Sequence, residues 1–92
     1  MTPQHKSFEE LTVSVIGGAG HVGLPFSIVV ANAGVKQVYG IDVDADKCDL
    51  LNQGEMIYIE EGGEDALRAA IAKGNILFTT DVNKKYLLVC RA

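Results

Sequence analysis

The chain of 92 residues is long enough for one domain with a hydrophobic core, but short for an enzyme that needs both a nucleotide fold and a substrate domain. Hydrophobic residues make up 48% of it and charged residues 22%, and the net charge of −4 argues against nucleic-acid binding as the main role. No apolar run could span a bilayer, and residues 1–10 lack the apolar segment of a secretory signal. We expect a flexible leader over 1–10, one domain over 11–92, no membrane partner and a cytoplasmic location.

The two cysteines, Cys48 and Cys90, are too few for a disulfide framework and indicate reduced thiols. No Cys-x-x-Cys or His-x₃-His spacing is present in the sequence. We therefore expect no metal site.

The first elements in chain order are a strand and a helix. Residues 11–16 are rich in β-branched residues and end in glycines, as in a buried parallel strand. Residues 21–33 have apolar side chains at helical spacing, and Gly34 follows as a stop. The apolar positions that fall at this spacing are Val22, Phe26, Val29, Val30 and Ala33.

The pattern then repeats. Residues 35–42 predict a second strand, Asp44 is placed to cap a helix through about Asn52, residues 64–73 predict a helix, and residues 76–80 predict a third strand. The order implies a parallel sheet with right-handed crossovers, so we predict a Rossmann-like α/β half-domain with three parallel strands in the order 3-2-1. The side chains expected to face the core from these helices are Cys48, Leu51, Leu67, Ala70 and Ile71.

The C-terminal segment 86–90 also has strand character, but only residues 81–85 separate it from the third strand. A parallel crossover needs about a dozen residues or more, so we expect an antiparallel hairpin against 76–80. That arrangement leaves the first strand with an unpaired edge. We therefore expect self-association through this edge.

A glycine-rich loop joins the first strand to the first helix, which is the context that a dinucleotide-binding loop requires. Gly18 would permit the tight turn, Gly20 would let a pyrophosphate approach the backbone, and Gly23 would let the helix pack closely. The helix N-terminus offers free N–H groups to the phosphates. The alternative is a glycine-rich turn with no ligand. The candidate binding residues of the loop are Gly18, Ala19, Gly20, His21, Val22 and Gly23.

Asp42 ends the second predicted strand, 19 residues after Gly23, near the spacing of about 20 residues expected for a ribose-binding acid. Its carboxylate would accept hydrogen bonds from the ribose hydroxyls and would repel a 2′-phosphate. The expected cofactor is therefore NAD rather than NADP. The alternative is that Asp42 merely begins the helix cap, for which Asp44 is better placed.

Three stretches together, VSVIGGAGHVGLP, YGIDVDADKCDLLNQG and GNILFTTD, resemble the nucleotide-sugar dehydrogenases, namely the UDP-glucose, UDP-N-acetylmannosamine and GDP-mannose 6-dehydrogenases. These enzymes oxidise the C6 alcohol of the sugar to a carboxylate with NAD. The resemblance runs over about residues 12–81 and implies that 18–23 form the phosphate loop and that Asp42 is the ribose acid. It also implies that Lys47 lies by the adenosine ribose, although an ordinary solvated lysine remains an alternative.

The sequence departs from the family in several places. Gly17 lengthens the loop by one residue and permits a GxxGxxG interpretation, as in short-chain epimerases and reductases. His21 replaces an aromatic residue and is expected to contribute only a backbone N–H. Neither Cys48 nor Cys90 matches the family's nucleophile, and the resemblance puts the family's catalytic residues beyond residue 92, so we predict no catalytic residue in this chain.

We therefore expect a truncated, catalytically incomplete NAD-binding portion that binds NAD or ADP-ribose. Two alternatives stay open. The chain could be a fragment of an extended short-chain epimerase or reductase, although neither Tyr58 nor Tyr86 is followed by the Tyr-x₃-Lys spacing of that class. It could also be a nucleotide-binding module that is not an enzyme.

Overall fold

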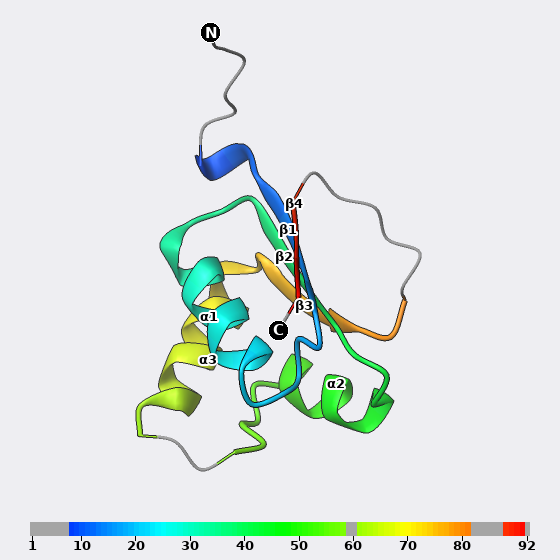
Figure 1. The fold of residues 1–92 in the computed structure, drawn as a ribbon. Helices are drawn as coiled ribbons and strands as arrows, with labels where there is room; N and C mark the ends of the chain where they lie inside the picture. The colour runs from blue at the N-terminus through cyan, green and yellow to red at the C-terminus, as the bar shows by residue number, and fades with distance from the viewer. Residues whose placement is uncertain (1–7, 59–60, 82–87, 92) are drawn as a thin grey trace, which may run out of the picture.

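The computed structural model describes residues 8–58, 61–81 and 88–91. These residues form strands and helices in the order that the sequence predicts (Figure 1). The leader predicted over 1–10 lies mostly outside the described residues, and its last three residues form a 3-10 turn. Within the described part, no helix has the length and apolar character needed to cross a membrane. The elements are η1 (Phe8–Glu10), β1 (Thr12–Ile16), α1 (Gly23–Ala33), β2 (Gln37–Ile41), α2 (Ala45–Asn52), α3 (Gly63–Lys73), β3 (Ile76–Thr79) and β4 (Leu88–Arg91).

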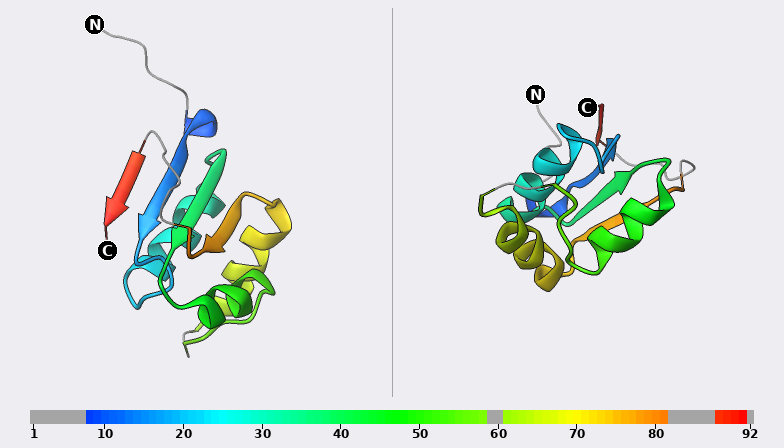
Figure 2. Two further views of the ribbon diagram at one scale, coloured as in Figure 1. Left: turned by 90° about the vertical axis from the view of Figure 1, so that its right-hand side faces the viewer. Right: turned by 90° about the horizontal axis from the view of Figure 1, so that it is seen from below.

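The strands form one sheet in the order β3-β2-β1-β4 (Figure 2). β1 pairs with β2 in parallel, with Val13 opposite Val38, and β2 pairs with β3 in parallel, with Val38 opposite Ile76. The prediction of three parallel strands in the order 3-2-1 is confirmed. Since parallel strands end at the same edge, the loop after β1 and the residue after β2 meet there.

The predicted antiparallel hairpin at the C-terminus is wrong. β4 lies parallel to β1, with Val13 opposite Leu88 and Ile16 opposite Arg91. The chain of eight residues between β3 and β4 is shorter than a helical crossover, but a helix is not needed to make the connection. Eight extended residues span up to about 27 Å. The distance from the end of β3 to the start of β4 is only about 20 Å, because it combines three strand spacings across the sheet with the length of one short strand.

This pairing also changes the edges of the sheet. β1 is hydrogen-bonded on both sides, so the open β1 edge on which we based the expectation of self-association is not present. The outer strands of the described sheet are β3 and β4. Self-association itself stays a prediction without this support.

Helix α1 buries a different set of positions from the apolar ones that fall at helical spacing in the sequence. Val22, Phe26 and Val29 are 70%, 41% and 66% exposed. The buried positions are Gly23, Leu24, Ser27, Ile28 and Ala31. The helix is apolar on nearly every side, so spacing alone does not orient it. The one polar residue of the buried face, Ser27, donates its hydroxyl to the carbonyl of Gly23 at 2.7 Å and so carries no unpaired group into the core.

The core lies between the sheet and the helices, and the predicted core side chains of α2 and α3 are confirmed. Cys48, Leu51, Leu67 and Ala70 are buried, and Ile71 packs against them half-buried. The helix ends also follow the sequence: Gly34 and Gly74 are left-handed C-caps, with φ of 105° and 76°.

Two asparagine side chains join neighbouring elements by hydrogen bonds to the backbone. Asn52 at the end of α2 donates to the carbonyl of Phe78 at 2.8 Å and accepts from the N–H of Phe78 at 2.8 Å. Its amide therefore pairs with the outer edge of β3 as a neighbouring strand would. Asn75, just before β3, donates to the carbonyls of Ala31 and Val35, each at 2.9 Å, and so ties β3 to the end of α1.

Candidate functional site

Two residues of the glycine loop require glycine for different reasons, Gly17 for its backbone conformation and Gly18 for its close contact with β2. Gly17 has φ of 80°, which favours glycine, so the turn itself falls on Gly17 rather than on Gly18. Gly18 lies against β2, since a Cβ added there would come within 2.4 Å of the Cα of Gly40. The N–H groups of Gly17 and Gly18 both donate to the carbonyl of Ile41, at 2.8 and 3.1 Å. The loop is therefore joined to the end of β2.

The N-terminus of α1 presents open hydrogen-bond donors. The N–H of Gly20 bonds to the carbonyl of Gly17, and that of Leu24 bonds to the carbonyl of Gly20. Within the described chain, the N–H groups of the three intervening residues have no acceptor. The N-cap has no side-chain cap, and the first turn has no acidic residue. These donors and the helix dipole favour an anion at this point. The three residues are His21, Val22 and Gly23.

Asp42 follows β2 and turns its carboxylate back to the loop. One carboxylate oxygen, Oδ2, accepts from the N–H of Ala19 at 3.1 Å, and Oδ1 accepts from the N–H of Asp44 at 3.2 Å. The cap of α2 is Asp44, whose carboxylate accepts from the N–H of Lys47 at 3.1 Å. Asp42 is therefore not the helix cap, and its carboxylate joins the strand end to the glycine loop.

Two hollows meet at this edge of the sheet. One has a volume of about 270 Å³ and is lined by Gly17, by the loop from Gly20 to Gly23 and by Asp42. The other has about 320 Å³ and is lined by Gly17 and Asp42 together with apolar residues. The two hollows adjoin at Gly17 and Asp42, and we call them together the groove, with donors at one end and an apolar wall at the other. The apolar wall consists of Ile16, Ile41 and Val43.

Tyr58, which sequence reasoning did not connect with the loop, lies against it. Its hydroxyl donates to the carbonyl of Ala19 at 3.0 Å, and its ring stacks on His21 with ring centroids 4.0 Å apart. The ammonium of Lys47 is 3.5 Å from the hydroxyl of Tyr58 and 5.7 Å from its ring centroid. The structure thus brings His21 and Lys47 together through Tyr58. No local motif predicts this contact, because Tyr58 and Ala19 are 39 positions apart in the sequence.

Cys48 lies beneath the site but is not exposed to it. Burial raises the pKa of its thiol, and the nearby carboxylates of Asp42, Asp44 and Asp49 raise it further. A buried thiol with a raised pKa is a poor nucleophile. The side chain of Cys90 lies outside the described residues. Among the side chains that the structure describes, no group of three His, Cys, Asp or Glu is arranged to hold a metal ion.

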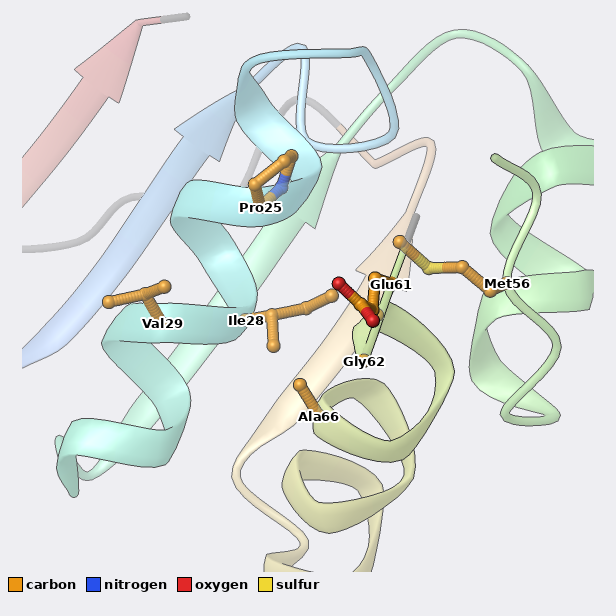
Figure 3. A pocket seen from close by; sticks show the side chains of 8 residues that line it. Pro25, Ile28, Val29, Met56, Glu61, Gly62 and Ala66 are labelled. Carbon is orange, nitrogen blue, oxygen red and sulfur yellow. The ribbon is translucent and has the colours of Figure 1, made fainter. Parts of the chain in front are cut away.

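A further hollow lies between α1 and the start of α3, away from the loop (Figure 3). Its volume is about 150 Å³, and its walls are mostly apolar, with the Glu61 carboxylate among them. None of the residues predicted from the sequence as ligand-binding lies in it. The loop, Asp42 and Lys47 therefore stand as the candidate site.

Comparison with known proteins agrees with this geometry. The model of the UDP-glucose/GDP-mannose dehydrogenase family, NAD binding domain, matches residues 11–88. The chain belongs to this family. Membership confirms the resemblance drawn from the sequence and decides against the short-chain epimerase and reductase alternative. It also identifies the Rossmann-like unit as the NAD-binding domain of the family.

The matches to individual relatives cover most of this chain but only a small part of each relative. The chain is 34% identical over 70 residues to NDP-N-acetyl-D-galactosaminuronic acid dehydrogenase of Ralstonia nicotianae, which is 76% of this chain and 16% of the relative. It is 39% identical over 66 residues to GDP-mannose 6-dehydrogenase of Pseudomonas putida, which is 72% of this chain and 15% of the relative. The chain thus spans about 16% of the length of the curated relatives it matches.

Solved structures give the same result. UDP-N-acetyl-mannosamine dehydrogenase from Staphylococcus aureus matches with a TM-score of 0.81 and 27% identity, over 88% of this chain and 19% of that one. GDP-mannose dehydrogenase from Pseudomonas aeruginosa, solved as a ternary complex, matches with a TM-score of 0.70 and 35% identity, over 75% of this chain and 15% of that one. The shared fold is that of their N-terminal portion.

Proposed function

We propose that this chain binds the ADP-ribose part of NAD in the groove along the ends of β1 and β2, as the NAD-binding portion of a nucleotide-sugar 6-dehydrogenase. The observation that carries the proposal is the pairing of open donors with a fixed carboxylate. The N–H groups at the start of α1 lack acceptors in the described chain, and Asp42 lines the same hollow. These are the two groups that a pyrophosphate and a ribose need.

The roles that we propose for the site residues follow from their positions around the groove. The backbone of residues 18–23 would receive the pyrophosphate, with His21, Val22 and Gly23 as donors. Asp42 would accept from the ribose hydroxyls, because each carboxylate oxygen has a lone pair left beyond its present hydrogen bond. Lys47 stands beside the loop and would offset part of the phosphate charge.

NAD would be preferred over NADP for an electrostatic reason. A 2′-phosphate on the ribose would lie against the Asp42 carboxylate, and the overall charge of the chain is already −4. Like charges held in contact cost free energy unless a cation separates them. Lys47 is the nearby cation, but its ammonium lies at Tyr58.

We further propose that the chain is catalytically incomplete. The two relatives described above are dehydrogenases by name, and this chain spans 16% and 15% of their lengths. Oxidation of a sugar alcohol would need a nucleophile and a proton acceptor from the rest of such an enzyme. A cytoplasmic location, in keeping with the free thiol of Cys48, is part of the proposal, as is the absence of nucleic-acid and membrane partners.

Calorimetric titration of the chain with NAD, ADP-ribose and NADP tests the ligand. We expect NAD and ADP-ribose to bind with similar dissociation constants of about 0.1 to 1 mM, because half a dinucleotide fold contacts only the ADP-ribose. NADP should bind at least about tenfold more weakly, since it brings two like charges together. Tighter binding of NADP than of NAD would overturn the role of Asp42.

Absorbance at the NADH band tests the incompleteness. The chain with NAD and UDP-glucose, UDP-N-acetylmannosamine or GDP-mannose should give no NADH. A steady rise that disappears on substitution of a cysteine would contradict the proposal.

A further inference from the structure

One residue in the middle of the glycine loop is held from both sides by side chains that come from elsewhere. Ala19 is fully buried. Its N–H donates to Asp42 at 3.1 Å, and its carbonyl accepts from the hydroxyl of Tyr58 at 3.0 Å. Both polar groups of this residue are thus paired outside the loop. The Asp42 contact belongs to the candidate site, whereas the Tyr58 contact has no part in the proposed ligand binding.

The ring of Tyr58 adds a second support at the next turn of the loop. It stacks on the His21 ring with centroids 4.0 Å apart and an interplanar angle of 29°. His21 is itself mostly exposed, and its N–H is one of the open donors at the start of α1. Tyr58 therefore touches the loop at two points, on either side of Gly20.

Tyr58 does not stand in the space where the ligand would lie. The hollow of about 270 Å³ is lined by residues of the loop and Asp42, and Tyr58 is not among its lining residues. Its contacts reach the Ala19 carbonyl and the His21 ring from the side of α2, where Lys47 also meets it. An aromatic residue in this position supports the loop and leaves the groove open.

We propose that Tyr58 is a positioning residue that holds the phosphate-binding loop in its ligand-ready shape before the dinucleotide arrives. Glycines lose more conformational freedom on ordering than other residues, so a loop rich in them is costly to order. When the folded chain has already ordered the loop, that cost does not reduce affinity. That the loop binds a dinucleotide rests on the proposed function, whereas the contacts by which Tyr58 holds the loop do not.

The test uses three variants of the whole chain. Tyr58→Phe removes the hydroxyl and keeps the stack, and Tyr58→Leu removes both. Ser14→Ala is the control, because it removes a buried hydroxyl that has no hydrogen-bond partner among the described residues. Calorimetry should show NAD binding weakened by about 3- to 10-fold in Tyr58→Phe, the effect of one net hydrogen bond, and more in Tyr58→Leu. Ser14→Ala should bind like the parent chain.

Two readouts on the free chain separate positioning from general stability. Amide exchange at Ala19 and Gly20 should be several-fold faster in Tyr58→Phe, while exchange in the centre of β1 stays unchanged. The His21 ring protons should keep their chemical shifts in Tyr58→Phe and lose the ring-current shift in Tyr58→Leu. Thermal unfolding of each variant verifies that the fold is present, and if Tyr58→Leu does not fold, Tyr58→Phe decides.

The two proposals fail differently. If the parent chain binds no NAD, the proposed function fails, and loop exchange in the free variants still decides whether Tyr58 holds the loop. Unchanged exchange at Ala19 in Tyr58→Phe would overturn the positioning role. Weaker NAD binding with unchanged loop exchange would also overturn it, because Tyr58 would then act on the ligand itself.

Discussion

Replacing Gly18 by alanine should destabilise the fold, whereas the same change at Gly20 should not. A Cβ on Gly18 would lie 2.4 Å from the Cα, and 2.8 Å from the carbonyl carbon, of Gly40. Both neighbours are backbone atoms of a central strand, so neither can rotate away. A Cβ on Gly20 would meet only the carbonyl oxygen of Gly17, at 3.2 Å, which a small shift relieves.

The magnitude follows from what must move. Restoring ordinary contact requires the loop and β2 to separate by about 1 Å at Gly18, and overpacking of this kind costs about 1–3 kcal/mol. The separation also stretches the hydrogen bonds from Gly17 and Gly18 to the carbonyl of Ile41, now 2.8 and 3.1 Å. Each is worth about 0.5–1.5 kcal/mol, so the total loss is about 2–6 kcal/mol if both are lost. That is a large part of the stability of a small domain.

Urea unfolding followed by circular dichroism measures this loss. With a slope of about 1–2 kcal/mol per molar urea, Gly18→Ala should lower the midpoint by at least about 1 M. Gly20→Ala is the matched control, since it adds the same methyl group to the same loop, and its midpoint should stay within about 0.3 M of the parent. Equal midpoints for the two variants would refute the argument that Gly18 is required by contact with Gly40.

Three further predictions concern the site and the thiol beneath it. Asp42→Ala should weaken NAD binding by about 1–3 kcal/mol in calorimetry, because the ribose hydroxyls lose their acceptor, and an unchanged affinity would place the ribose elsewhere. Gly20→Val should abolish NAD binding with an unaltered circular dichroism spectrum, since its side chain would fill the phosphate position, and parent-like binding would move the site away from the loop. Because burial raises the pKa of Cys48, the unfolded chain releases its thiol proton first, so stability should be unaffected by this group below about pH 9 and should fall above it. Cys48→Ala should remove that part of the pH dependence. An equal fall of the urea midpoint above about pH 9 in both chains would contradict this.

The features that follow from residues close in the sequence were predictable. The strand before the loop, the glycines, the helix after it and the acid at the end of the next strand all lie within residues 11–42. Asp44 could be recognised as a cap because its side chain reaches only three residues ahead, to the N–H of Lys47. The family resemblance rested on the same local motifs, and the family match extends over residues 11–88.

Where several arrangements satisfied the local pattern, only the tertiary structure decided. Helix α1 is apolar on nearly all sides, and the burial of Ser27 instead of Phe26 depends on how the helix meets the sheet. The position of β4 is given by its parallel pairing with β1, which no residue near it in the sequence indicates. Neither question has a signal in the spacing of the apolar residues.

Tyr58 is the clearest case at the site. Its sequence neighbours mark it neither as a ligand-binding residue nor as a loop contact. Only the path of the chain after α2 brings its hydroxyl to the carbonyl of Ala19, which had to find a donor because that residue is fully buried. The residues of the dinucleotide site that we propose were therefore predictable from local chemistry. That the distant side chain of Tyr58 holds the loop was decided by the tertiary structure, because the buried carbonyl of Ala19 needs a hydrogen-bond donor.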